Sequence, residues 1–180
     1  MFNKDYLRKK FLSKRKKYYF EVNNTFFNPL FSLLKKNKKK KLNLSIYFPT
    51  NFELNIIKIL DIKNIKNSEI LLSVVVKKNT LKFYKWSFKD PLKINQFGIL
   101  EPILSNSKAL LPDIMLIPLI AYDNSNYRLG YGKGYYDRYL NKNKNVTTIG
   151  IAFSFQKYHK LPTSKFDVKL DYILTEKGLK

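Results

Sequence analysis

A short glycine-rich segment carries the residues of this sequence whose types and spacing suggest chemistry. Gly130, Gly132 and Gly134 are three of the six glycines in the chain and lie within five residues. Glycine permits backbone conformations with positive φ and lets a ligand approach the main chain closely. Where such a loop opens a helix, its free N–H groups and the positive end of the helix dipole attract an anion. The spacing therefore predicts an anion-binding loop.

Charged side chains around these glycines indicate that the anion is a phosphate group. Arg128, Lys133 and Arg138 supply positive charge within the same segment. Asp137 lies in the first turn of the helix-like stretch 135–140, where a carboxylate can hold the metal ion that accompanies a polyphosphate. The segment thus predicts a phosphate site assisted by a metal ion.

Simpler interpretations of the same residues stay open at this point. The glycine pattern is also compatible with a plain tight turn. It is not a P-loop, because no Gly-Lys-Ser/Thr sequence follows, and it is not the dinucleotide fingerprint, because the third glycine comes one residue early. Asp137 would also suit the positive end of a helix dipole, a contribution of a few tenths of a kcal/mol.

The composition is that of a globular protein with a strong excess of positive charge. The 180 residues include 14 Phe, 13 Tyr and no Cys, and the formal net charge is +22. The absence of cysteine excludes a disulfide framework, a thiolate zinc site and a cysteine nucleophile. The longest strongly apolar run, 114–121, is too short to span a bilayer, and the charged N-terminus lacks a signal-peptide core. We therefore expect a cytoplasmic protein with no membrane partner, and we expect a monomer.

The net charge alone favours a nucleic-acid partner. However, 31 of the 35 basic residues are Lys and only four are Arg. Lys, Asn, Ile, Phe and Tyr all have A/T-rich codons, so a base-composition bias accounts for their joint abundance. A specific nucleic-acid binder makes more use of the planar, bidentate arginine side chain. We expect weak electrostatic attraction to RNA and no specific nucleic-acid partner.

Apolar patterns along the chain predict an α/β domain. Helices are expected within 5–34 and at 53–62. Strands are expected at 42–48, 70–76, 80–86, 113–118, 146–153 and 170–174. The pattern predicts a single domain, 1–180, which includes an N-terminal helical arm, 1–35, and a central mixed, mostly parallel sheet flanked by helices. In such sheets a ligand binds beyond the carboxyl ends of the strands.

The extended string from Arg128 to Asp137, preceded by Pro118 and the pair Tyr122-Asp123, resembles the 5-formyltetrahydrofolate cyclo-ligase family, also called methenyltetrahydrofolate synthetases. The similarity runs nearly end to end and includes Lys4 and Arg8, Ser45 to Phe48 with Glu53, Phe97 to Pro102, Ile151 to Gln156 and Val168 to Asp171. The chain departs from the family pattern at Leu119, where Gly is common, and at Ser73, where Pro is usual. The resemblance implies a sugar-isomerase/CoA-transferase-like fold.

The resemblance also implies a reaction in which ATP and 5-formyltetrahydrofolate give ADP, phosphate and 5,10-methenyltetrahydrofolate. ATP is the co-substrate and Mg²⁺ the metal ion. The γ-phosphoryl group is transferred to the formyl oxygen, N10 attacks the formyl carbon, and phosphate leaves. Such chemistry depends on alignment and charge neutralisation more than on a protein nucleophile.

Site residues follow from the same resemblance. The expected ATP-binding residues are Lys4, Arg8, Arg128, Leu129, Gly130, Tyr131, Gly132, Lys133, Gly134, Tyr135 and Tyr136. The expected substrate-binding residues are Thr50, Glu53, Phe97 and Tyr135. The expected catalytic residues are Arg128, Lys133 and Tyr135, and the expected metal ligands are Asp137 and Asp171.

Several of these residues have structural interpretations as well. Asp171 would suit a surface ion pair with one of the many lysines, and Glu53 would suit the first turn of a helix. Because Tyr135 and Tyr136 are adjacent, only one of them easily faces a ligand from a helix, and the other is expected in the core. The choice of the N-terminal basic pair among so many basic residues rests on the resemblance.

Two other classes of function remain compatible with the sequence. A different ATP-dependent or sugar-phosphate enzyme on the same scaffold would bind a nucleotide but not respond to folates. A non-enzymatic nucleic-acid-binding domain would show a steep salt dependence and no requirement for Asp137.

Overall fold

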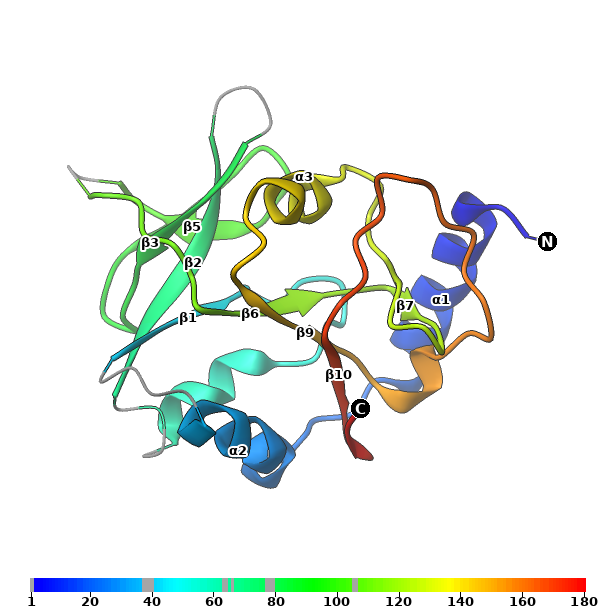
Figure 1. The fold of residues 1–180 in the computed structure, drawn as a ribbon, viewed down its shortest axis with the longest axis horizontal. Coiled ribbons are helices and arrows are strands. Elements are labelled where there is room, and N and C mark those ends of the chain that lie inside the picture. Colours follow the sequence, from blue (N-terminus) through cyan, green and yellow to red (C-terminus); the bar gives the residue numbers. More distant parts are fainter. Residues whose placement is uncertain (1, 37–40, 63–64, 66, 77–79, 105–106) are drawn as a thin grey trace.

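A seven-stranded mixed sheet forms the centre of the fold (Figure 1). The computed structural model describes residues 2–36, 41–62, 65, 67–76, 80–104 and 107–180. Within them the strand order is β11-β10-β9-β6-β1-β2-β3. The strands from β10 to β2 in this order are parallel to their neighbours, and β11 and β3 pair antiparallel at the two edges. This is the mixed, mostly parallel sheet that the sequence predicts.

The helices and strands follow one another in an α/β order. The helical segments are α1 (Lys4–Tyr18), η1 (Asn24–Phe27), α2 (Asn28–Lys36), η2 (Ile56–Asp61), α3 (Tyr135–Lys142) and η5 (Ser154–Gln156). The strands are β1 (Leu42–Ile46), β2 (Ser68–Val76), β3 (Thr80–Lys85), β4 (Leu92–Ile94), β5 (Leu100–Pro102), β6 (Ile114–Pro118), β7 (Ala121–Tyr122), β8 (Arg128–Leu129), β9 (Thr147–Ile151), β10 (Tyr172–Thr175) and β11 (Gly178–Leu179).

Strand β6 shows how the sequence builds a core on each face of the sheet. Successive residues of a strand point to opposite faces. Ile114 and Leu116 accordingly join the apolar cluster that contains α2 residues, whereas Met115 and Ile117 join the cluster that contains Leu140 of α3. Figure 1 shows α2 and α3 on opposite sides of the sheet. Because both faces are covered, this strand is a continuous apolar run in the sequence.

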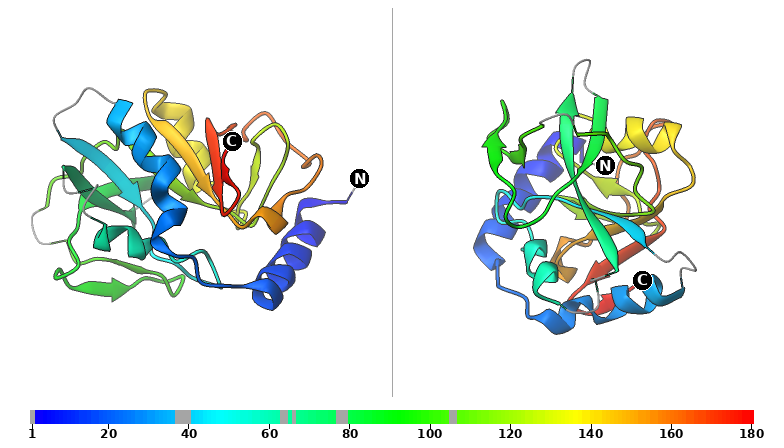
Figure 2. Two further views of the ribbon diagram at one scale, coloured as in Figure 1. Left: turned by 90° about the horizontal axis from the view of Figure 1, so that it is seen from below. Right: turned by 90° about the vertical axis from the view of Figure 1, so that its left-hand side faces the viewer.

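Helix α1 lies at the end of the sheet beside β7 and is joined to α2 by an extended segment (Figure 2). The Asn3 side chain caps this helix by accepting a hydrogen bond from the Tyr6 N–H at 2.8 Å. Leu7 and Phe11 are buried in a third apolar cluster, which includes Leu129 of β8. From this helix, Arg8 and Arg15 reach the loop that follows β8.

The expected N-terminal helices and all six expected strands are present with boundaries shifted by a few residues, but the expected helix at 53–62 is wrong. Only Ile56–Asp61 is helical, as a 3₁₀ helix. Before it, the Glu53 N–H donates to the Thr50 carbonyl at 2.9 Å, and the Thr50 N–H donates to the Glu53 carboxylate at 2.9 Å. Asn51 and Phe52 have φ values of 49° and 60°, which a helix excludes. A turn closed by the Glu53 side chain therefore stands where the first helical turn was expected.

Gly150 of β9 is closely packed against its neighbours. A Cβ atom at this position would lie 2.7 Å from Ile173 Cδ1 and 2.8 Å from both Leu119 Cδ2 and Leu170 Cδ1. We expect Gly150→Ala to lower the free energy of unfolding by about 1–3 kcal/mol through overpacking, measured by urea denaturation. Gly130→Ala is the matched control, because a Cβ there meets nothing within 4 Å. Equal stability of the two variants would contradict this account.

Candidate active site

The glycine-rich loop joins β8 to the start of α3, as the sequence predicts. Gly132 and Gly134 have φ values of 93° and 65°, which favour glycine over other residues. Gly134 is the N-cap residue of α3 and supplies no side chain to cap it. The positive end of the α3 dipole therefore has no capping side chain from this residue, and this end of a helix attracts an anion.

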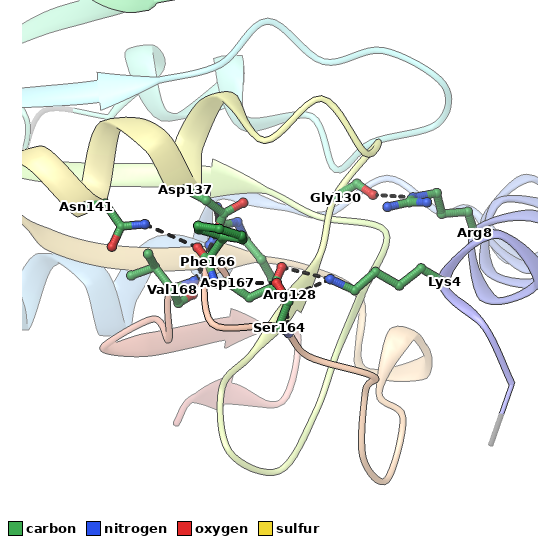
Figure 3. Close-up of polar contacts among 10 residues, drawn as sticks. All are labelled: Lys4, Arg8, Arg128, Gly130, Asp137, Asn141, Ser164, Phe166, Asp167 and Val168. Carbon is green, nitrogen blue, oxygen red and sulfur yellow. Dashed lines mark hydrogen bonds and ion pairs between the residues drawn. The ribbon is translucent and has the colours of Figure 1, made fainter.

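Helix α1 presents two basic side chains to this loop (Figure 3). Arg8 Nε donates to the Gly130 carbonyl at 2.9 Å, and the Arg8 guanidinium carbon lies 3.1 Å from the position of a Cβ at Gly132. Lys4 Nζ donates to the two carboxylate oxygens of Asp167 at 2.9 and 2.7 Å. The basic pair thus shares one helix face, and that face meets the glycine loop.

Arg128 is buried beneath the loop, with a side chain that is 4% exposed. Its Nη2 atom lies 2.9 Å from Asp137 Oδ1, and its Nη1 atom donates to the Val168 carbonyl at 3.1 Å. The Val168 N–H in turn donates to Asp137 Oδ1 at 3.0 Å. Burial lowers the pKa of the guanidinium, and the Asp137 charge opposes this. Arg128 therefore ties β8, α3 and the segment around Val168 together, whereas the sequence suggested that it touches ATP.

Asp167 lies at the centre of the contacts drawn in Figure 3. Besides Lys4, the Ser164 hydroxyl donates to its carboxylate at 2.9 Å. Burial raises the pKa of Asp167, but hydrogen bonds from Lys4 and Ser164 outweigh this and hold the pKa below its ordinary value. The Asp167 charge also acts on the buried Arg128 guanidinium. Asp137 is thus ion-paired with Arg128, and Asp167 lies near enough for its charge to act on the same guanidinium.

Asp171, the other expected metal ligand, is hydrogen-bonded to Thr148. Its Oδ2 atom accepts hydrogen bonds from the Thr148 N–H at 2.8 Å and the Thr148 hydroxyl at 2.7 Å. Asp171 immediately precedes β10, and the register of β10 against β9 sets it beside Thr148 at the amino ends of these strands. Asp167, four residues earlier, is the carboxylate that the structure brings to the loop.

A second part of the site surrounds Glu53, which is 6% exposed. One carboxylate oxygen accepts the Tyr131 hydroxyl at 3.0 Å, and the other accepts the Thr50 N–H at 2.9 Å. Burial raises the pKa of Glu53, and the nearby Arg15 charge opposes this. Thr50 and Glu53 line a cavity of about 760 Å³. The turn that replaces the expected helix thus places the buried carboxylate at the wall of a cavity and against the glycine loop.

Aromatic side chains contact each other at the start of α3. The Phe97 and Tyr135 ring centroids lie 6.0 Å apart, and the Arg138 guanidinium lies 5.2 Å from the Tyr135 ring centroid. Burial raises the pKa of Tyr136, and its hydroxyl is hydrogen-bonded to Ser73. Both rings of the adjacent pair are partly buried against the apolar cluster that contains Leu140. Lys133 is exposed on the loop.

Sequence reasoning missed two residues of this site, Arg15 and Asp167. Asp167 and Asp171 lie in the same short segment of the sequence. The residue at which β10 starts is the signal that distinguishes them, because Asp171 directly precedes this strand and Asp167 does not. Arg15 was one of 35 basic residues. Its position seven residues after Arg8, on the same helix face, was the available signal.

Among the described residues, no group of three or more His, Cys, Asp or Glu side chains is arranged to hold a metal ion. A divalent ion at Asp137 and Asp167 would therefore need further ligands from water or from a bound phosphate, as Mg²⁺ commonly uses. None of the described helices is long and apolar enough to cross a membrane.

A mostly parallel α/β sheet with a glycine loop and buried arginines defines a class of protein whose loop is suited to binding an anion. The model of the 5-formyltetrahydrofolate cyclo-ligase family matches residues 2–176, and the chain belongs to this family. The 5-formyltetrahydrofolate cyclo-ligase of Haemophilus influenzae is 35% identical over 145 residues, which cover 76% of this chain and 77% of the relative.

Two solved structures share the fold. The NMR structure of Aquifex aeolicus 5,10-methenyltetrahydrofolate synthetase matches with a TM-score of 0.77 and 32% identity, over 98% of this chain and 91% of that chain. A Mycoplasma pneumoniae 5,10-methenyltetrahydrofolate synthetase matches with a TM-score of 0.70 and 26% identity, over 96% and 98% of the two chains. The expected family and fold are both confirmed.

The Lys4–Asp167 pair gives a pH dependence that can be measured. Because the pKa of Asp167 is lowered from 3.8, its contribution to stability is present above that value and is lost as the pH falls through the lowered pKa. We expect Asp167→Asn to reduce the free energy of unfolding by about 1 kcal/mol at pH 7, and the difference from wild type to shrink at pH 3. Urea denaturation at both pH values measures this.

Lys4→Met is the matched variant, since it removes the other partner of the same pair. It should show the same loss at pH 7 and the same convergence at low pH. A difference from wild type that stays constant between the two pH values would contradict the assigned ion pair.

Proposed function

We propose that this chain is a 5-formyltetrahydrofolate cyclo-ligase, which uses ATP to convert 5-formyltetrahydrofolate to 5,10-methenyltetrahydrofolate with release of ADP and phosphate. Membership of the family supports this reaction. The observation that carries it is the bond between the Tyr131 hydroxyl and Glu53, because it joins the anion-binding loop to a buried carboxylate at the wall of a cavity. Two different substrates would therefore bind side by side.

In this proposal the triphosphate lies over the glycine loop. The N–H groups of residues 129–136 and the Lys133 ammonium contact its oxygens. Arg8 and Lys4 reach the same place from α1. Because Arg128 is buried and ion-paired with Asp137, it acts by holding the loop in shape.

Asp137 and Asp167 have the oxygen donors that Mg²⁺ prefers, and the charges of both act on Arg128. We propose that these two carboxylates hold the ion, directly or through water. When bound, the ion would offset the negative charge of the phosphate groups.

The folate would occupy the cavity beside Glu53 and the adjoining aromatic surface. Glu53 accepts hydrogen bonds from N–H and amino groups of the pterin, and Thr50 fixes the carboxylate. Phe97 and Tyr135 offer flat faces to an aromatic part of the substrate. A volume of about 760 Å³ is within the usual range for a ligand of this size.

The residues of this site would promote the reaction by alignment and electrostatics. A formamide oxygen is a weak nucleophile, so it must be held in line with the γ-phosphoryl group, which Glu53 and the glycine loop do from the two sides. Negative charge on the transferred group is balanced by Lys133, Arg8 and the loop N–H groups. N10 then attacks the activated formyl carbon, and phosphate leaves.

We also propose that the protein acts as a monomer in the cytoplasm and has no specific nucleic-acid partner. The small share of arginine among its basic residues supports the last point.

The test is a near-ultraviolet assay with 5-formyltetrahydrofolate and MgATP, in which the product absorbs directly. Wild type should form product only when ATP is present. Asp137→Asn should lower kcat/KM by about 10–100-fold or more, because it weakens the proposed metal site and uncouples the buried Arg128. A folded protein that binds nucleotide but forms no product would overturn the folate assignment in favour of another enzyme on this scaffold.

Asp167→Asn and Asp171→Asn separate the two possible partners of Asp137. We expect Asp167→Asn to raise the Mg²⁺ concentration for half-maximal activity by about 10–100-fold, because it removes a proposed ligand. Asp171→Asn should leave that concentration unchanged, since its carboxylate bonds to Thr148. The opposite ranking in a magnesium titration would restore Asp171 as the ligand.

A further inference from the structure

A buried arginine of α1 lies beneath the glycine loop, and the reaction described above does not use it. Arg15 is 1% exposed and belongs to the last turn of α1. Its Nε donates to the Asn51 carbonyl at 2.9 Å, its Nη1 to the Leu119 carbonyl at 3.1 Å, and its Nη2 to the Tyr131 hydroxyl oxygen at 2.6 Å. The side chain thus joins α1 to the turn before η2, to the end of β6 and to the glycine loop.

Tyr131 extends this contact to the folate side of the site. Its hydroxyl accepts from Arg15 and donates to Glu53 Oε1 at 3.0 Å. Tyr131 is nevertheless 40% exposed, so it extends from the surface of the loop to the buried carboxylate of Glu53. A cation, a phenol and a carboxylate therefore form one continuous chain between three segments distant in sequence.

Arg15 is also the cation that faces Glu53. The titratable groups around this carboxylate come from separate elements: Arg15 of α1, Tyr47 after β1, Tyr131 of the loop and Tyr136 of α3. Burial raises the pKa of Glu53, whereas the Arg15 charge and the hydrogen bonds from Thr50 and Tyr131 lower it. The orientation of Glu53 and the position of its pKa thus depend on the loop and on α1.

We propose that Arg15 and Tyr131 are positioning residues that couple the two ligand sites, so that nucleotide bound at the glycine loop tightens folate binding at Glu53. This inference rests on the proposed function, which assigns the two ligands. A bound nucleotide fixes the loop and with it the Tyr131 hydroxyl. Glu53 is then already oriented when folate arrives, so the second ligand does not bear the cost of ordering it. The coupling is reciprocal, because it is a free energy shared by both ligands.

If Arg15 had only a structural role, its hydrogen bonds to two main-chain carbonyl groups would account for that role. The bonds to Asn51 and Leu119 tie α1 to the rest of the fold whether or not a ligand is bound. The bond to Tyr131 differs, because it leads to a side chain that bridges the two sites. Tyr131→Phe removes this bridge alone and leaves Arg15 with both carbonyl acceptors.

The experiment is a calorimetric titration of 5-formyltetrahydrofolate with and without a saturating, non-hydrolysable β,γ-imido analogue of ATP and Mg²⁺. In wild type we expect the analogue to lower the folate Kd at least about fivefold. In Tyr131→Phe this ratio should fall close to one. Tyr122→Phe is the matched control, because its hydroxyl donates to the Ser154 carbonyl at 3.4 Å, outside the loop, and it should keep the wild-type ratio.

A second measurement separates the charge of Arg15 from its packing. Without the Arg15 cation, the pKa of Glu53 rises further. On a plot of folate affinity against pH, the acid limb should therefore move to higher pH in Arg15→Met. Arg15→Lys keeps the charge and should restore the limb toward its wild-type position. A structural role alone would lower the melting temperature of both variants and leave the acid limb in place.

The outcomes distinguish this inference from the function on which it rests. If wild type turns over the substrate but Tyr131→Phe keeps the wild-type ratio, the coupling is overturned and the cyclo-ligase assignment stands. A wild-type ratio of one in an active enzyme has the same consequence. If wild type has no cyclo-ligase activity, the proposed function fails and the coupling between these ligands fails with it.

Discussion

The burial of the Arg128 guanidinium is the constraint on which the glycine-loop side of the site depends. A buried cation is tolerated only where its donors are satisfied and an opposite charge lies close. Asp137 and the Val168 carbonyl meet this requirement, and the Val168 N–H closes the arrangement by donating to Asp137. Three segments that are remote in sequence are thereby fixed at the first turn of α3. Asp167 and Lys4 add α1 to the same arrangement.

A second buried arginine acts on the other side of the loop. Arg15 joins Tyr131 to the main chain near Asn51, and Tyr131 reaches Glu53. Two buried guanidinium groups therefore hold the loop, Arg128 through Asp137 in the first turn of α3 and Arg15 through Tyr131 within the glycine segment. Such fixed geometry has a direct use in a reaction between two bound substrates, because misplacement by about 1 Å costs as much as 100-fold in rate.

The parts of this architecture that depend on local chemistry could be predicted from the sequence. Positive φ at Gly132 and Gly134 and the helix after them follow from the residues themselves, and the alternating burial of β6 follows from its apolar run. The parts that local chemistry does not determine depend on tertiary register. Asp171, and not Asp167, stands beside Thr148 only because β10 begins at Tyr172.

The turn at Glu53 failed for a related reason. Its propensity for a helical first turn is overridden by its own carboxylate, which binds the Thr50 N–H and the Tyr131 hydroxyl. The second of these partners lies 78 positions away, and no local pattern contains it. The sequence pattern thus indicated Glu53 as a candidate site residue but predicted a helical backbone where the structure has a turn.

The distribution of arginine in this chain supports the proposal that its net charge of +22 does not mark a specific nucleic-acid partner. The chain has only four arginines, and all four lie at the glycine loop: Arg8 on the Gly130 carbonyl, Arg15 on the Tyr131 hydroxyl, Arg128 on Asp137, and Arg138 over the Tyr135 ring. Lysine carries the remaining positive charge.

A guanidinium offers five donors in a rigid plane, whereas an ammonium is a compact point charge. Arg15 uses that plane to satisfy three acceptors at once while buried, which a lysine at this position would not do. The arginines are therefore concentrated where donor geometry is needed. The charge that suggests a nucleic-acid partner is carried by lysine, whereas the residue type best suited to reading nucleic acid is committed to this one site.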